Sequence, residues 1–517
     1  MNDVSWIKIP LPDDVLRQKM AGHMEEAIRT IDHMLSGFLP ECMRKRLEME
    51  KQIIGILNIE EYPYDYEAAL ALLKESFVDF KDEELDQLIA ASAADWIYIE
   101  GKIHFHKKFF DNIVKTRPDY SDRLKTTEND EFNTKRQKML NDNVAYMKIN
   151  GGRTIKTTIR ASVRINKDAE RVGEKVRVYL PIPQICRQNS DIQILEASPE
   201  ITYIADENAP QRTVCFETVL KPDQEFFVRY SFINHVKYVD PKPEAVTAIK
   251  DKSSRRTDTA QASTCPKTPV LQSEPVCFKT LDLQSESAYT EIPVSQSESD
   301  SPTTSASHQN YNNYLDEQAP HIIFTPFMKE LLDEIRQDET NPLVIARRIY
   351  DFITTKVKYS FVREYAALDN ISEYAAKNLK GDCGVQAILF ITLCRLAGIP
   401  ARWQSGLYAT DMYTGCHDWA EFYVEPYGWM YADPSFGGSA YRTGQTERWN
   451  YYFGNLDIYR MVANSAMQSE FNPPKRYFRA DPVDNQRGEV EYENRGLDFT
   501  EFTAEQVTES MEDIELK

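Results

Sequence analysis

The chain has 517 residues and a formal net charge of −20, with 42% apolar and 27% charged residues. A chain of this length is expected to fold into two to four domains. The acidic excess disfavours nucleic acid and anionic membrane surfaces as partners, because phosphate binding needs a basic face. No run of 18 apolar residues occurs, so no transmembrane helix is expected.

The N-terminus and the cysteines predict the compartment. The first residues, MNDVSWIKIPLPDDVL, lack the basic and apolar regions of a secretory signal. The eight cysteines are scattered and form no CxxC pair; they are Cys42, Cys186, Cys215, Cys265, Cys277, Cys383, Cys394 and Cys416. A disulfide framework is therefore not expected, and we predict a cytoplasmic, reducing location.

Residues 1–142 are predicted to form a helical domain. Apolar residues recur at steps of three and four on one face, at Leu16, Met20, Met24, Ala27, Ile28, Ile31 and Leu35. The same spacing is seen from Leu85 to Trp96 and from Phe105 to Ile113. The pattern favours a helical bundle with its own core. A scaffold for a protein partner is the alternative, although no period near 34 residues is visible.

Residues 143–240 are predicted to form an antiparallel β domain, most simply a sandwich. In RTIKTTIRASVRI, at 153–165, alternate residues are apolar, as in a half-buried strand. The stretches KVRVYLPIP, RTVCFETVL and EFFVRYSF resemble it, with turn-rich sequence between them. Residues 241–313 then fill with Ser, Thr, Gln and Pro, which is typical of a disordered linker.

Residues 314–485 are predicted to form an α+β domain, in which helices come first and strands follow. The helical stretches are TPFMKELLDEIRQ, NPLVIARRIYDFITTKVKY and residues 381–397, the last ended by Gly398 and Pro400. The strand-like stretches are ARWQSGLYA, HDWAEFYVE and WMYADPS. Residues 486–517 are expected to add one strand, and the last fifteen or so, which are acidic, are expected to fray. The whole chain is thus expected to be α+β and multidomain.

Cys383 is the candidate nucleophile. It opens a predicted helix in GDCGVQAILFITLC, where free N–H groups and the helix dipole favour a thiolate. Gly381 and Gly384 leave the backbone open to a substrate carbonyl. A lone cysteine at a helix start is more often simply packed, so the interpretation depends on partners downstream.

His417 and Asp433 supply those partners. His417 opens the strand HDWAEFYV, and Asp433 ends the next predicted strand, in YADPS. Antiparallel strands joined by a short hairpin place the two side chains next to each other. A thiolate nucleophile works best with a base that is oriented by a third group. We therefore predict the order Cys383, His417, Asp433.

These three segments, GDCGVQAILFITLCRLAGIPAR, HDWAEFYV and GWMYADPSF, resemble the transglutaminase-like superfamily, of papain-like fold and bacterial type. The resemblance covers roughly residues 325–440 and is looser in the preceding β domain. It implies a nucleophile-bearing helix packed on a sheet that carries the histidine and the aspartate. By position it implies Cys383 as nucleophile, His417 as base and later acid, and Asp433 as orienter.

The sequence departs from the animal transglutaminases at two points. No tryptophan lies between Trp96 and Trp403, so the usual second donor to the oxyanion is unassigned, and Tyr359 or Tyr365 is a candidate. No D-x-D-x-D-G calcium loop occurs. No cofactor is expected.

Other residues near these motifs have structural interpretations. Cys394 and Cys416 are expected to pack in the core, and Asp382 is expected to cap its helix. A zinc site from Cys383, Cys416, His417 and Asp433 is disfavoured, because structural zinc uses ligands paired at short spacing, so no metal is expected. Trp403, Trp419 and Trp429 are expected in the core rather than as the floor of a substrate cleft.

The expected function is that of a thiol enzyme that forms an acyl-thioester on Cys383 and acts on peptide or protein amide bonds. Hydrolysis, by a cysteine protease or amidase, is favoured over transamidation because water is the abundant acceptor. One alternative is a peptide N-glycanase-type deglycosylase, whose zinc-binding cysteine pairs are missing here. The other is a non-catalytic protein-binding module on the same fold.

Overall fold

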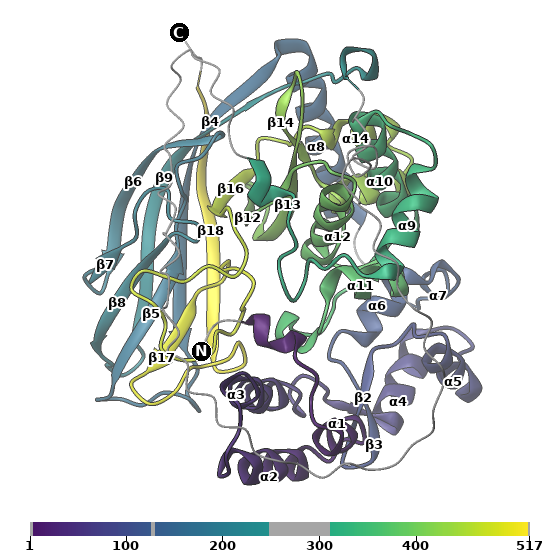
Figure 1. The fold of residues 1–517 in the computed structure, drawn as a ribbon. Coiled ribbons are helices and arrows are strands. Elements are labelled where there is room, and N and C mark those ends of the chain that lie inside the picture. The colour runs from purple at the N-terminus through teal and green to yellow at the C-terminus, as the bar shows by residue number, and fades with distance from the viewer. Residues whose placement is uncertain (1–3, 126–129, 248–310, 515–517) are drawn as a thin grey trace, which may run out of the picture. The chain divides into compact units, whose positions relative to one another are not determined.

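The computed structural model describes residues 4–125, 130–247 and 311–514 (Figure 1). The described residues combine helices with sheets, which confirms the expected α+β class. Nearly all of the predicted linker at 241–313 lies outside the described residues. Within those that are described, no helix has the length and apolar character needed to cross a membrane.

The N-terminal residues are mostly helical, as predicted, but they also contain a small sheet. The helices are η1 (Val4–Lys8), α1 (Asp13–Met20), α2 (Met24–Leu35), α3 (Glu41–Ile56), α4 (Tyr66–Ser76), α5 (Asp82–Ala90), α6 (Phe109–Thr116), α7 (Pro118–Ser121) and α8 (Asp130–Asn150). The sheet has the order β1-β3-β2, from Tyr64–Asp65, Lys102–Phe105 and Trp96–Ile99. Trp96 and Phe105, expected on helices, therefore lie on paired strands. Glu100 and Gly101, with φ of 47° and 73°, make the tight turn between β2 and β3.

Two four-stranded antiparallel sheets form the β-sandwich. One has the order β18-β4-β9-β6, from Phe502–Asp513, Gly152–Ile165, Glu225–Lys237 and Asn189–Ser198. The other has the order β17-β5-β8-β7, from Glu489–Tyr492, Lys175–Pro181, Thr213–Val219 and Tyr203–Ile204. In Figure 1 the yellow strands β17 and β18 lie beside the blue strands of these sheets. The sandwich is thus completed by the C-terminal end of the chain.

Strand β18 corrects the expectation that the last residues fray. Residues 502–513 pair with β4 from Phe502↔Ile165 to Asp513↔Ile155. The side chains of Ala504 and Gln506 are half-buried, whereas those of the alternate residues Thr503 and Glu505 are exposed. An edge strand held mainly by backbone hydrogen bonds needs few apolar residues. The composition of residues 502–513 therefore did not indicate a strand.

A third sheet lies among the helices of the C-terminal half, in the order β15-β14-β13-β12-β16. Its strands are Phe453–Gly454, Gly428–Ala432, Thr414–Val424, Ala401–Ala409 and Arg460–Asn464. The helices are α9 (Pro326–Arg336), α10 (Pro342–Lys356), α11 (Ile371–Asn378), α12 (Cys383–Leu396), α13 (Pro434–Arg442) and α14 (Thr446–Tyr451). The short parallel pair β10 (Lys358–Tyr359) and β11 (Lys380–Gly381) leads into α12. Nearly every side chain of α12 is buried, so the helix is the centre of this core.

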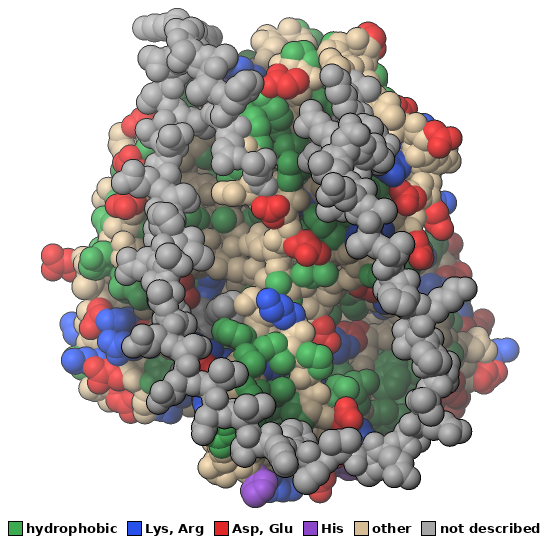
Figure 2. Space-filling view, in the orientation of Figure 1, with side chains coloured by type: hydrophobic (Ala, Val, Ile, Leu, Met, Phe, Trp, Pro, Cys, Tyr) green, Lys and Arg blue, Asp and Glu red, His purple; other side chains and the backbone are tan. Residues whose placement is uncertain are grey.

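The third sheet also shares a core with the sandwich. Leu407 and Ala409 on β12, and Met461 and Ala463 on β16, pack in the same buried cluster as the sandwich strands. Figure 2 shows one face of the molecule, on which Asp and Glu side chains are interspersed with Lys and Arg. The shared core fixes strand β13 between the sandwich and helix α12, and this is where the predicted site residues lie.

Candidate functional site

Helix α12 positions Cys383 as its first residue. Asp382 is the N-cap, and its Oδ1 accepts a hydrogen bond from the Val385 amide at 3.0 Å, as the sequence predicted. The Tyr365 hydroxyl donates to the same Oδ1 at 2.6 Å. The cap therefore has two donors, which hold the first turn and Cys383 in a defined place.

The Cys383 thiol donates to Asp418 Oδ2, with a sulfur–oxygen distance of 3.1 Å. Burial raises the pKa of the Cys383 thiol well above its usual range, and the carboxylates of Asp418 and Asp382 raise it further. The sequence predicted the opposite direction from the helix dipole. A helix end carries only about half a charge, so burial and two nearby carboxylates outweigh it.

His417 and Asp433 lie together as predicted, with His417 Nε2 2.8 Å from Asp433 Oδ2. His417 is on β13, and Asp433 follows β14 as the N-cap of α13, where its Oδ1 accepts from the Phe436 amide at 2.9 Å. The Arg460 guanidinium, from β16, lies 2.9 Å from Asp433 Oδ2. All three side chains are buried, so the carboxylate is held from two sides.

The contact with Asp433 assigns the hydrogens of His417. A carboxylate only accepts, so Nε2 carries the hydrogen and Nδ1 carries the lone pair in the neutral ring. Burial lowers the pKa of His417, although Asp433 opposes the shift. Burial alone would raise the pKa of Asp433, but its interactions with His417 and with the Arg460 cation bring it below its usual value. The imidazole is therefore neutral at neutral pH, with a lone pair that can accept a proton.

The structure does not join the sulfur to the imidazole. Among the described residues, the side-chain partner of the Cys383 thiol is Asp418, and no hydrogen bond links it to His417. Residues 417 and 418 are consecutive on a strand, so their side chains point to opposite faces. Of the three predicted residues, two are in contact and the third is bonded to the neighbour of the histidine.

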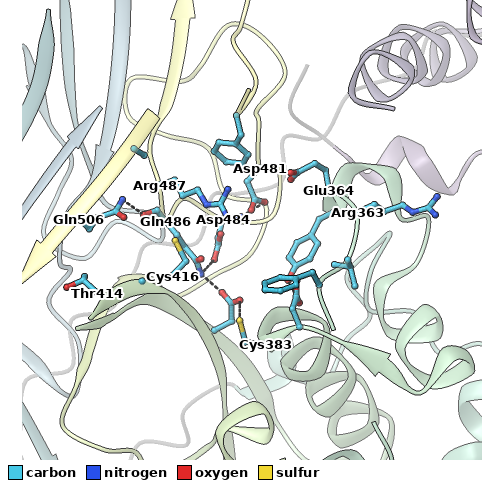
Figure 3. A pocket seen from close by; sticks show the side chains of 18 of the residues that line it. Arg363, Glu364, Cys383, Thr414, Cys416, Asp481, Asp484, Gln486, Arg487 and Gln506 are labelled. Atoms are coloured by element: carbon cyan, nitrogen blue, oxygen red, sulfur yellow. Dashed lines mark hydrogen bonds between the residues drawn. The ribbon is translucent and has the colours of Figure 1, made fainter. Parts of the chain in front are cut away.

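Cys383 opens into a cavity of about 430 Å³ that is rich in carboxyl groups. Figure 3 shows Cys383 at its base, with Asp481, Asp484, Gln486 and Arg487 reaching in from the segment before β17, and Gln506 from β18. Gln486 Nε2 donates to Asp418 Oδ1 and, at 3.1 Å, to Asp484 Oδ2. Burial raises the pKa of Asp484 to about 7, with a further contribution from Asp481, and burial raises the pKa of Asp382 to about 6.

His417 lines a second cavity, of about 460 Å³, which has a different character. Its lining contains Lys115, Arg136 and Arg442 and no carboxylate. The two cavities share four lining residues, Tyr359, Phe361, Tyr413 and Cys416. Thus the thiol and the imidazole face adjoining spaces separated by the same few side chains.

The sequence interpretation missed Asp418, Arg460 and Gln486. Asp418 follows His417 directly, so the alternation of a strand could have placed it on the other face. Arg460 lies 27 residues beyond Asp433, on a strand with no visible link to it. Gln486 lies in an irregular segment, and no motif in the neighbouring sequence indicates a role for it.

The remaining residues singled out from sequence have identifiable contacts. The Tyr365 hydroxyl is engaged by Asp382, whereas Tyr359 lines both cavities and its hydroxyl makes no hydrogen bond with the described residues. Trp403 and Trp419 are buried and donate to Ser405 and Gln404, and neither lines a cavity with Cys383 or His417. Over the described parts of the chain, no group of three or more His, Cys, Asp or Glu side chains could hold a metal ion.

Comparison with known proteins identifies one part of the chain. Residues 329–434 match the transglutaminase-like superfamily. No protein of curated function matches significantly. A solved structure from Cytophaga hutchinsonii, named a "Putative Cysteine Protease", is 12% identical, with a TM-score of 0.38 over 70% of this chain and 98% of its own. The periplasmic domain of TgpA from Pseudomonas aeruginosa is 13% identical, with a TM-score of 0.25 over 60% of this chain and 96% of its own.

Proposed function

We propose that the transglutaminase-like superfamily domain at residues 329–434 is a thiol hydrolase of peptide or protein amide bonds. The observation that carries this proposal is the buried His417–Asp433 pair, whose geometry leaves Nδ1 as a free base beside the helix that bears Cys383. A base held by a carboxylate is the arrangement that activates a thiol nucleophile.

The reaction begins when the thiol turns from Asp418 and Nδ1 of His417 takes its proton. The thiolate attacks the amide carbon, a C–S bond forms, and the electron pair of the C=O bond moves to the oxygen. The candidate donors to that oxygen are the Cys383 amide and the hydroxyl of Tyr359, which lines the same cavity as Cys383. Tyr365 is excluded from this role because Asp382 accepts its hydroxyl hydrogen.

The oxyanion then collapses, the C–N bond breaks, and the amine leaves with the proton from Nδ1. A water molecule gives a proton to Nδ1 and attacks the thioester, the C–S bond breaks, Nδ1 returns the proton to the Cys383 sulfur, and a carboxylic acid is released. Hydrolysis is favoured over transamidation because the polar, carboxyl-lined cavity at Cys383 can admit water. The proposed location is the cytoplasm, where reducing conditions keep Cys383 as a thiol; fractionation with an organelle or periplasmic marker checks this.

The experiment combines turnover of a peptide-amide library with iodoacetamide labelling mapped to single cysteines. Cys383→Ala should abolish turnover, and His417→Ala should lower kcat by about 10²–10⁴-fold. Tyr359→Phe should lower kcat through loss of the oxyanion donor, with little change in KM. Cys42 is exposed and should be labelled equally in every variant, which makes it the internal control.

A non-catalytic protein-binding module is the second candidate, because the thiol donates its hydrogen bond to Asp418 and, among the described residues, none to His417. It predicts turnover that is absent, or that survives Cys383→Ala, together with labelling of Cys383 that is indifferent to His417→Ala. Either turnover result would overturn the thiol-hydrolase proposal.

A further inference from the structure

The cavity that His417 lines is bordered by three cations that come from separate elements. Lys115 is on α6, Arg136 on α8 and Arg442 on α13. Lys115 and Arg442 are exposed and Arg136 is half-buried, so a solute can reach them. Ser435 and Ser439 add hydroxyl groups from α13, and the lining contains no Asp or Glu.

None of these cations forms an ion pair with a described carboxylate. Lys115 lies 5.9 Å from the centre of the Tyr359 ring and 5.5 Å from that of Phe361. Arg136 lies 5.1 Å from the centre of the Phe436 ring, and its buried Nε has no hydrogen-bond partner. In a chain with a net charge of −20, carboxylates are abundant. Three cations around one space whose lining holds no carboxylate favour a ligand that carries a negative charge.

The position of the cavity beside His417 indicates which part of a substrate would lie in it. In the proposed reaction, His417 gives its proton to the departing amine, so the amine side of the scissile bond must lie at His417. The cavity lined by His417 is the one bordered by the cations. The adjoining cavity at Cys383 combines five carboxyl groups, Glu364, Asp382, Asp418, Asp481 and Asp484, with two arginines, so it is less favourable for an anion.

We infer that this cavity is a subsite for a carboxylate on the residue that leaves as the amine. The substrate class is then peptides cleaved close to a free C-terminus, or before a residue with an acidic side chain. The inference rests on the proposed function for the identity of the leaving side, but the binding of the carboxylate can be measured without turnover.

The first test compares two peptides that differ only at the leaving residue, one a free acid and the other its C-terminal amide. The free acid should have a kcat/KM at least about tenfold higher, and the difference should shrink as salt is raised. Arg136→Gln and Arg442→Gln should each reduce this preference. Lys138→Gln is the matched control, because Lys138 is on the same helix but pairs with Asp142. A third peptide, an amide with aspartate at the leaving position, distinguishes a side-chain carboxylate from a terminal one.

The second test uses Cys383→Ala and calorimetric titration with the same peptides. Tighter binding of either carboxylate peptide than of the neutral amide, lost in the Arg136→Gln double variant, supports the subsite even if no turnover is found. Equal affinity for all three peptides, or no binding of any, overturns it. Turnover with no preference for a carboxylate would overturn the inference and leave the hydrolase proposal standing.

Discussion

At the scale of single residues, Asp418 is the side chain that accepts the hydrogen bond of the thiol and adds to the effect of burial on its pKa. Its Oδ2 accepts from Cys383, while its other oxygen accepts from Gln486. Burial raises the pKa of Asp418 well above its usual range, helped by Asp484 and Asp382. The carboxyl group of Asp418 favours the protonated form of the Cys383 thiol.

Asp418→Asn is expected to make Cys383 more reactive. The carboxylate raises the pKa of the thiol because like charges disfavour the thiolate, so its removal lowers that pKa. At a given pH below the thiol pKa, the thiolate fraction rises and alkylation becomes faster. The measurement is the rate of iodoacetamide alkylation of Cys383 from pH 6 to 10, with the exposed Cys42 as reference. A midpoint that stays in place or moves to higher pH would contradict this account.

At the scale of elements, the first turn of α12 depends on one glycine. A Cβ on Gly384 would lie 2.2 Å from the Tyr365 hydroxyl and 2.9 Å from Asp418 Oδ2. From the sequence, this glycine is expected to leave the backbone open to a substrate carbonyl. The structure adds a second reason, since Tyr365 must approach the helix to donate to Asp382.

Gly384→Ala should destabilise the protein even though alanine is the better helix former. We expect overpacking at Tyr365 and Asp418 to cost about 1–3 kcal/mol and to exceed the gain in helix propensity, about 1 kcal/mol. Gly55→Ala on α3 is the matched control, because a Cβ there meets nothing within 4 Å. It should be neutral or stabilising. Urea denaturation measures the free energy of unfolding of both variants. Equal gains in stability would show that the first turn of α12 accommodates a Cβ without overpacking.

At the scale of the whole molecule, the C-terminal residues join the strands of residues 152–237 in one sandwich. Strand β18 pairs with β4, and β17 pairs with β5, so residues beyond 485 complete sheets that begin near residue 152. Gln506 on β18 and Gln486 before β17 also line the cavity that holds Cys383. The sandwich therefore contributes directly to the candidate site.

A chain that ends at Glu501 should lose both stability and thiol protection. Removal of β18 leaves the edge of β4 unpaired, deletes the buried ring of Phe502 and uncovers the sandwich core behind it. We expect a fall in Tm of several degrees or more, with faster alkylation of Cys383 as its cavity opens. A chain that ends at Ile514 keeps the strand and is the control. Equal Tm values for the two chains would mean that β18 is dispensable.

Local pattern and spacing determined much of this protein. Alternation located β4, β5, β8 and β9, the N-cap at Asp382 followed from its position before an apolar helix, and the pairing of His417 with Asp433 followed from strand order. Each depends on neighbours close in the sequence, where periodicity and backbone geometry are sufficient.

Only the tertiary structure decided which groups surround the sulfur. Asp418, Gln486 and Asp484 lie 35 to 103 residues after Cys383 in the chain, but they line the same cavity. Burial and nearby carboxyl groups, rather than the helix end, set the direction in which the pKa of the thiol shifts. Strand β18 and the cations beside His417 were likewise invisible, because their partners come from distant elements. Burial and electrostatic interactions depend on which residues are close in three dimensions, so the sequence pattern alone does not reveal them.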